Sequence, residues 1–261
     1  AASDVYKRQE KLKCYRKSGF NRISIGCQSV HDEELKRLGR IHTFAEFQES
    51  FVLARDAGFA NINVDLMSGL PEQSEEKWEE SLRTIAELSP EHISAYSLIV
   101  EEGTPFAAMA ERGELPLPEE ETERAMYEET IEVLAKYGFH RYEISNYARD
   151  GYECRHNVGY WIRRDYLGFG IGAASLIDNV RFQNEKSLGA YLAHPLESRE
   201  EEQTLTVQDR MEETMFLGLR LTRGVSCVDF AEQYGRTVEE VYGEVIARNV
   251  ADGLLTVTER K

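Results

Sequence analysis

The feature that most constrains the fold is a threefold succession of a short β-branched strand, a polar loop and a helical stretch. The strands begin near Arg22, Asn61 and His92, and ~30–40 residues is the usual length of a β-loop-α unit in a parallel sheet. Consecutive right-handed crossovers of this kind favour a full or partial barrel. We therefore predict an α/β fold built on a partial (β/α) barrel.

The helical stretches carry clear start and stop signals. Thr43 and Glu46 form the pattern of a capping box, and Gly58 is placed to end that helix. Ser74 offers an N-cap to the next helix, whose apolar positions begin at Trp78. A third helical stretch is predicted over 118–139.

The pattern changes after Gly138 and again near Thr206, where helical segments dominate. Three helical segments followed by the strand-like LLTVTE (254–259) predict a small, mostly helical, winged-helix-like C-terminal domain. We place the barrel and a polar motif segment in residues 10–175 and the C-terminal domain in 176–261.

The first nine residues, AASDVYKRQ, show no hydrophobic periodicity. They are one in-frame translation of a string that resembles the end of a transposon-based sequencing adapter. We expect residues 1–9 to be foreign and the natural gene to have been cut just before Glu10.

Composition narrows the class of partner. With 261 residues and 41% hydrophobic residues the chain can bury a substantial core, and its formal net charge of −16 disfavours binding to nucleic acid. No apolar run approaches the ~20 residues that span a bilayer, so we expect a cytoplasmic protein with no transmembrane segment. The four cysteines are scattered without a CxxC pair, which predicts reduced thiols and neither a disulfide framework nor a self-contained metal site.

Three polar residues fall where strands of a barrel end and loops begin. Gln28 follows RISIGC, Asp65 follows NINV, and Arg40 lies in a loop just before a helix. At the C-terminal rim of a barrel, an amide, a guanidinium and a carboxylate could bind an amino acid group and a ribose diol. The alternative is that Gln28 and Asp65 only cap loops.

The stretch ECRHNVGYW (153–161) places His156 among a cysteine and two aromatic residues in a turn-rich segment. A neutral imidazole can bind iron, and aromatic rings can pack against a macrocycle. A hydrogen-bonded loop histidine is the alternative. We expect His31, His92, His140 and His194 to be surface or loop residues without partners, whereas His42 could support Arg40. The glycines of GFGIGA (168–173) lack dinucleotide-binding spacing and instead predict a strand that a neighbour approaches closely.

Taken together, several segments resemble the radical S-adenosylmethionine (SAM) superfamily, in the branch of oxygen-independent coproporphyrinogen III oxidase and the HemW-like heme chaperones. The matching segments, in order, are GFNRISIGCQSVHDEELKRLGRIHT, NINVDLMSGLPEQ, EHISAYSLIVEEGTPF, YEISNYA, ECRHNVGYW and YLGFGIGAAS. The resemblance implies a radical SAM barrel, SAM as a ligand and a [4Fe–4S] cluster in the full-length protein. It assigns SAM contacts to Gln28, Arg40, Asp65, Ile99 and Ala174.

The same resemblance separates the two members of the branch. The oxidases resemble HRNxxGYT where the chaperones have HNxxYW, and this chain has His156 directly followed by Asn157. The motif HNxxY is associated with heme binding, which implies His156, Asn157 and Tyr160 as heme contacts and His156 as a candidate iron ligand. The leading interpretation is a heme chaperone that passes heme to a recipient protein, with peripheral membrane contact left open.

The departures from the family pattern also carry predictions. The CxxxCxxC motif that holds the cluster is absent, and neither Cys14 nor Cys27 has the spacing to replace it. We expect native sequence to be missing at both ends and the fragment to be inactive in SAM cleavage. The alternatives are oxygen-independent coproporphyrinogen III oxidase, which decarboxylates coproporphyrinogen III to protoporphyrinogen IX, and another radical SAM enzyme or a remnant without a role.

Overall fold

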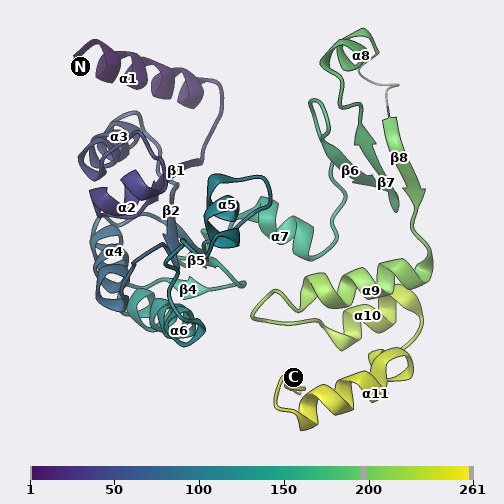
Figure 1. Ribbon diagram of the computed structural model, residues 1–261. Helices are drawn as coiled ribbons and strands as arrows, with labels where there is room; N and C mark the ends of the chain where they lie inside the picture. Colours follow the sequence, from purple (N-terminus) through teal and green to yellow (C-terminus); the bar gives the residue numbers. More distant parts are fainter. Residues whose placement is uncertain (1, 195–198, 259–261) are drawn as a thin grey trace. The chain divides into compact units, whose positions relative to one another are not determined.

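A computed structural model describes residues 2–194 and 199–258 of the chain (Figure 1). The chain forms two compact units that divide between Glu153 and Cys154. The domain limit expected after residue 175 stays a prediction.

The first unit is built on a five-stranded sheet whose strand order is β1-β2-β3-β5-β4. The first three strands in this order are parallel, the fourth runs antiparallel to the third, and the fifth pairs antiparallel with the fourth. The strands are β1 (Ile23–Gln28), β2 (Ile62–Ser68), β3 (His92–Ser97), β4 (His140–Arg141) and β5 (Asn146–Ala148). The three parallel strands start within one residue of the predicted positions, because short β-branched runs between turns favour buried parallel strands.

The helices of this unit are α1 (Ala2–Lys17), α2 (Asp32–Arg37), α3 (Phe44–Asp56), α4 (Glu75–Glu87), α5 (Pro105–Glu111) and α6 (Glu120–Lys136). The capping box of Thr43 and Glu46 is present at the start of α3, and the Ser74 side chain caps α4. Gly58 has a φ of +91°, the left-handed conformation with which glycine ends helices. These start and stop signals are confirmed.

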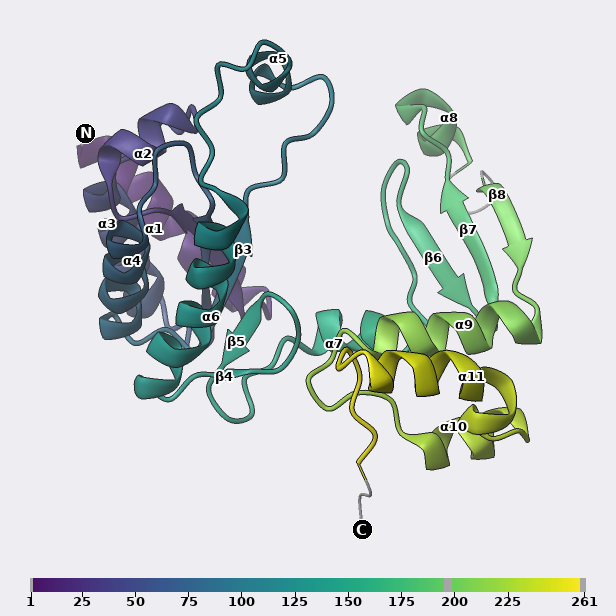
Figure 2. The same ribbon diagram turned by 60° about the horizontal axis from the view of Figure 1, so that its bottom comes forward.

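The core lies between one face of the sheet and helices α3, α4 and α6, which Figures 1 and 2 both show on the same side of the strands. Ile62, Val64 and Leu66 alternate along β2 and are fully buried on this face. The Trp78 indole of α4 donates hydrogen bonds to the Met126 carbonyl at 3.1 Å and to Thr130 Oγ1 at 2.9 Å. These bonds fasten α4 to α6, so the helices form one layer over the sheet.

The second unit contains a short helix, a three-stranded antiparallel sheet and a group of three helices. Its elements are α7 (Arg155–Trp161), β6 (Ala174–Ile177), β7 (Val180–Asn184), α8 (Leu188–Ala193), β8 (Arg199–Thr204), α9 (Val207–Gly218), α10 (Cys227–Tyr234) and α11 (Val238–Ala251). The three C-terminal helices confirm the helical C-terminal domain. Met211 of α9, Phe230 of α10 and Val238 of α11 form its buried centre.

Three local predictions for the second unit are wrong. The segment 153–161 is mostly the helix α7, whose i, i+4 spacing the polar composition conceals. Leu254–Thr258 contains no strand, because Leu254 and Val257 are exposed and the described residues offer no strand beside them. The glycine segment is a loop before β6, although the expected close approach is real: a Cβ at Gly168 would lie 2.3 Å from the Ala174 carbonyl oxygen.

Across the described ranges, no helix combines the length and the apolar character that crossing a membrane requires.

Candidate functional site

Two faces of the first unit's sheet differ sharply in chemistry. The face opposite the helices carries polar residues at alternate positions, because successive side chains of a strand point to opposite sides. The register places Ser24 beside Asn63 and Asn63 beside His92, and it places Asp65 between Gly26 and Ser94. This polar face is defined by Ser24, Gly26, Asn63, Asp65, His92, Ser94 and Tyr96.

Gln28 reaches the polar face through an irregularity at the end of β1. The register shifts between Gly26 and Gln28, and Gln28 has a φ of +70°, which non-glycine residues rarely adopt. Its side-chain amide folds back over Gly26, where a Cβ would lie only 2.7 Å from Gln28 Nε2. The Tyr96 hydroxyl donates a hydrogen bond to Gln28 Oε1 at 3.1 Å. Gly26 therefore makes room for the Gln28 amide.

Asp65 is held by two donors on the same face. Ser24 Oγ donates to Asp65 Oδ2 at 2.9 Å, and Asn63 Nδ2 donates to Asp65 Oδ1 at 2.7 Å. Both hydrogen bonds fix the orientation of the carboxylate. Asp65 is partly exposed, so its carboxylate remains accessible to a ligand.

His92 is the buried residue that contacts Asn63 on the polar face. Its ring is fully buried, with Nδ1 next to Asn63 Oδ1 and Nε2 accepting from the Tyr142 hydroxyl at 2.9 Å. Burial, together with the positive charge of Arg22, lowers the pKa of His92 to about 3. The imidazole is therefore neutral at physiological pH, and the prediction that His92 lacks partners is wrong.

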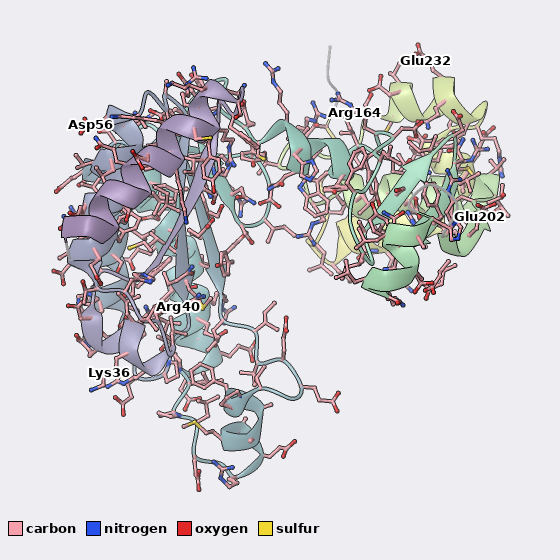
Figure 3. The ribbon with its side chains drawn as sticks, turned by 90° about the horizontal axis from the view of Figure 1, so that it is seen from above. Lys36, Arg40, Asp56, Arg164, Glu202 and Glu232 are labelled. Atoms are coloured by element: carbon pink, nitrogen blue, oxygen red, sulfur yellow. The ribbon has the colours of Figure 1, made fainter. Side chains whose placement is uncertain are left out.

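Arg40 is exposed in the loop after α2. Its positive charge and the negative charge of Asp65 both act on Tyr96, whose pKa is raised by burial first and by Asp65 second, with Arg40 opposing. His42 Nε2 lies 3.4 Å from the Cys27 carbonyl oxygen and ties the loop to the end of β1. Arg40, Asp65 and Gln28 therefore gather around Tyr96, and Figure 3 shows Arg40 beside the sheet.

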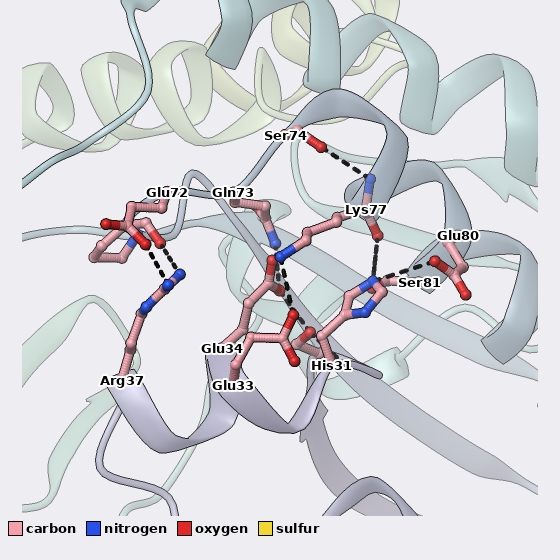
Figure 4. A network of polar contacts seen from close by, with 12 residues as sticks. His31, Glu33, Glu34, Arg37, Glu72, Gln73, Ser74, Lys77, Glu80 and Ser81 are labelled. Atoms are coloured by element: carbon pink, nitrogen blue, oxygen red, sulfur yellow. Dashed lines mark hydrogen bonds and ion pairs between the residues drawn. The ribbon is translucent and has the colours of Figure 1, made fainter.

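A polar network fixes α2, the helix that precedes Arg40 (Figure 4). The buried Glu34 carboxylate accepts hydrogen bonds from Ser29 Oγ at 2.6 Å and from Gln73 Nε2 at 3.0 Å. Arg37 pairs with Glu72, and Lys77 Nζ pairs with Glu33 at 2.9 Å. The His31 ring joins the same network by contacting the Lys77 carbonyl oxygen at 3.2 Å, which corrects the expectation that His31 has no partner.

The two remaining SAM-site predictions lie elsewhere. Ile99 is 79% exposed in the segment between β3 and α5, so it offers apolar surface near the end of β3. Ala174 is the exposed first residue of β6 in the second unit. Its approach to the polar face therefore stays a prediction.

The polar face fits a ligand that carries both charges and hydroxyl groups, as SAM does. It offers a carboxylate held by two hydrogen bonds, an amide and a phenol, and the exposed guanidinium of Arg40 lies in the loop after α2. A carboxylate suits an ammonium or a ribose diol, and a guanidinium suits a carboxylate. The residues present are consistent with a SAM site.

The second candidate site is a hollow of about 220 Å³ beside α7. Because His156 and Tyr160 are four residues apart on a helix, their rings share a face and meet edge to face, with centroids 4.7 Å apart. Tyr160 meets Tyr166 in the same manner at 4.7 Å. The hollow is lined by Arg155, His156, Gly159, Tyr160, Arg164, Asp165 and Tyr166.

The predicted heme residues divide between this hollow and its surroundings. The exposed His156 ring makes no hydrogen bond with the described residues, so both its nitrogens can bind a ligand. Asn157 is half-buried on the same helix and does not line the hollow. Cys154 is buried at the N-cap position of α7. An exposed imidazole beside aromatic rings fits a porphyrin iron.

The cysteines do not fit an iron–sulfur cluster. Over 2–194 and 199–258, no three side chains among His, Cys, Asp and Glu gather as a metal site. Cys27 is fully buried, and burial raises the pKa of its thiol, which disfavours the thiolate that binds metal. The described residues of this chain therefore supply no ligand set for the cluster.

Four residues of the polar face are not among the site residues predicted from the sequence: Tyr96, Asn63, Ser24 and His92. The signal was present as period-two alternation, in which polar residues recur at every second position of NINVD and HISAYS. The apolar residues indicate the strands, and of the polar residues that alternate with them only Asp65 carries a predicted role in the site.

Comparison with known proteins agrees with this architecture. The Radical SAM superfamily model matches residues 2–85, and the HemN C-terminal domain model matches residues 205–261. The structure of the Escherichia coli coproporphyrinogen III oxidase HemN, a radical SAM enzyme, aligns over 97% of this chain and 62% of that chain, with a TM-score of 0.78. At 24% identity this likeness shows the fold, and it confirms the mixed α/β architecture with a helical C-terminal domain.

Curated relatives are more similar in sequence. Heme chaperone HemW of Bacillus subtilis is 40% identical over 256 residues, which are 96% of this chain and 67% of the relative. Heme chaperone HemW of Escherichia coli is 36% identical over 93% of this chain and 64% of the relative. The chain thus spans about two thirds of the length of these relatives. Such identity over this length shows that the chain belongs to the HemW heme chaperone family of the radical SAM superfamily.

Proposed function

We propose that this chain binds heme through the hollow beside α7 and serves as the heme-binding part of a heme chaperone. The observation that carries the proposal is the exposed His156 ring, which lacks a hydrogen-bond partner in the described ranges and packs against Tyr160. An imidazole left free at the surface can take an axial position on heme iron, and the Tyr160 and Tyr166 rings offer apolar contact to a macrocycle. Asn157, on the same helix, completes the proposed contact set.

The polar face is proposed as the SAM site, with Gln28, Arg40 and Asp65 as polar contacts and with Ile99 and Ala174 as apolar or backbone contacts. Support comes from the convergence of Gln28, Asp65 and Arg40 around Tyr96. In radical SAM proteins, SAM bound to a reduced [4Fe–4S] cluster is the source of a carbon radical. The residues of the polar face would bind and orient SAM. The described cysteines form no site for the cluster, so this part of the chain would supply only SAM contacts.

The partners named by this proposal are heme and a protein that receives it. Peripheral membrane contact and a cytoplasmic location, both expected from the sequence, stay predictions. A role as coproporphyrinogen III oxidase is the competing function, but the directly adjacent His156 and Asn157 and the names of the relatives favour the chaperone.

Heme titration followed by absorption spectroscopy tests the proposed function. We expect the chain to bind hemin with a shifted Soret band, and His156→Ala to weaken binding by about tenfold or more, because an axial ligand is lost. Tyr160→Phe keeps the ring stack and should retain the affinity. The matched control is His140→Ala, which removes an exposed histidine from the first unit.

The outcomes are distinct. Equal hemin affinity in the wild type and in His156→Ala, with an unchanged Soret band, would remove His156 as the ligand. Anaerobic turnover of coproporphyrinogen III to protoporphyrinogen IX by the full-length protein, with SAM and a reductant, would favour the oxidase over the chaperone.

A further inference from the structure

Two arginines line the hollow beside α7. Arg155 is the first residue of that helix, and Arg164 follows the helix after a turn. Both side chains are exposed, and Figure 3 shows Arg164 at the surface of the second unit. Neither the motif HNxxY nor the predicted heme contacts include them.

Both arginines lack an ion-pair partner among the described residues. Their neighbour Arg163 behaves differently, since it is buried and its Nε donates to Glu213 Oε2 at 2.7 Å. The chain carries 47 acidic residues against 31 basic ones, so carboxylates are abundant. Two guanidinium groups that remain unpaired beside one hollow in such a chain are suited to an anionic ligand.

The walls of the hollow indicate the shape of that ligand. Tyr160 and Tyr166 present aromatic rings, and Gly159 contributes no side chain to the lining. A Cβ at Gly159 would lie 3.9 Å from Arg164 Cβ. Asp165 is the acidic member of the lining, and its Oδ2 accepts a hydrogen bond from the Asp178 amide at 3.1 Å. The site therefore combines cations with flat apolar surface.

We propose that Arg155 and Arg164 bind the propionate carboxylates of a porphyrin whose metal is held at His156. This inference rests on the proposed function and extends it from the iron to the edge of the macrocycle. A planar tetrapyrrole that carries two carboxylates on one edge presents the charges that guanidinium groups bind through paired hydrogen bonds. The arginines would select dicarboxylate porphyrins over esterified ones and set the orientation of the macrocycle.

The test compares hemin with hemin dimethyl ester, in which both propionates are neutral. Wild type, Arg155→Gln, Arg164→Gln and the double variant are titrated with each ligand at low salt. The matched control is Arg248→Gln, which removes an exposed arginine of α11 and the same charge. Far-UV circular dichroism checks that each variant is folded.

We expect each arginine variant to bind hemin about fivefold more weakly and the double variant to lose most of the wild-type preference for hemin over its ester. Arg248→Gln should match the wild type. Wild-type hemin affinity in the double variant, or an unchanged preference over the ester, overturns the arginine proposal alone if His156→Ala still weakens binding. A wild-type chain that binds neither ligand overturns the proposed function and the arginine proposal together.

Discussion

At the residue scale, the polar face works through hydrogen bonds that fix one carboxylate. His92 orients Asn63, and Asn63 and Ser24 then orient Asp65. Each donor is itself held by a strand, so the carboxylate keeps its orientation without a bound ligand. A group prepared in this way loses little conformational entropy when a ligand arrives.

The Asp65 carboxylate gives a prediction for SAM binding. Asp65→Asn removes the negative charge while keeping the size of the side chain, so we expect affinity for SAM to fall by about tenfold in equilibrium dialysis. Asp56→Asn, at the exposed end of α3, is the control and should bind as the wild type does. Equal affinity of Asp65→Asn and wild type, or no binding by either, would contradict the SAM assignment.

His92 gives a prediction for stability against pH. The ring takes up a proton near pH 6.5 when the chain is unfolded but only at about 3 when folded, so the unfolded state binds more protons between these values. The neutral ring makes its full contribution to the free energy of unfolding above pH 6.5. This contribution falls as the pH drops towards 3, by up to about 1.4 kcal/mol per pH unit. Urea unfolding from pH 7 to pH 4 should show this slope in the wild type and a shallower one in His92→Gln. If the free energy of unfolding depended on pH equally in the wild type and in His92→Gln, the lowered pKa of His92 would be refuted.

At the element scale, the second unit depends on a charged contact among three elements. Glu213 of α9 accepts hydrogen bonds from Arg163, which follows α7, and from Arg181 of β7, both at 2.7 Å. Burial raises the pKa of Glu213, but the hydrogen bonds from Arg181 and Arg163 outweigh burial and hold the pKa below its usual range. The contact therefore stabilises the unit at neutral pH and weakens in acid.

Removing this acceptor gives a prediction for local stability. Glu213→Gln leaves the buried Arg163 without a counter-charge, which costs roughly 3 kcal/mol. Amide hydrogen exchange measured by mass spectrometry should therefore be about a hundredfold faster in α9 and β7, where exchange follows local opening. Glu212→Gln, the exposed neighbour on the same helix, serves as the control. Unchanged exchange in Glu213→Gln would show that the contact contributes no stability.

At the scale of the whole molecule, the chain consists of two units with different architectures. The first is a helix-covered sheet with one polar face, and the second combines an antiparallel sheet with three helices. The antiparallel sheet was not expected, although Asp178 and Asn179, both at positive φ, mark a tight turn between β6 and β7. An Asp-Asn pair of this type in the sequence indicates a hairpin turn, which the prediction of a mostly helical C-terminal part did not use.

The sequence by itself determined the elements whose signals are local. The caps at Thr43 and Ser74 and the β-branched runs of β1, β2 and β3 follow from side chains that act on their own backbone. Motifs in order along the chain also identified the family, and they predict Gln28, Arg40, Asp65 and His156 as site residues.

Only the tertiary structure decided which residues meet. Tyr96 reaches Gln28, 68 positions away in sequence, because parallel strands and a shifted register bring them together. His92 is buried because β5 and its loop cover it, and nothing in EHISAYS alone indicates that cover. Arg155 and Arg164 join one hollow because the chain turns after α7. The contacts of Tyr96 and His92 depend on the packing of distant segments, which a local pattern does not encode.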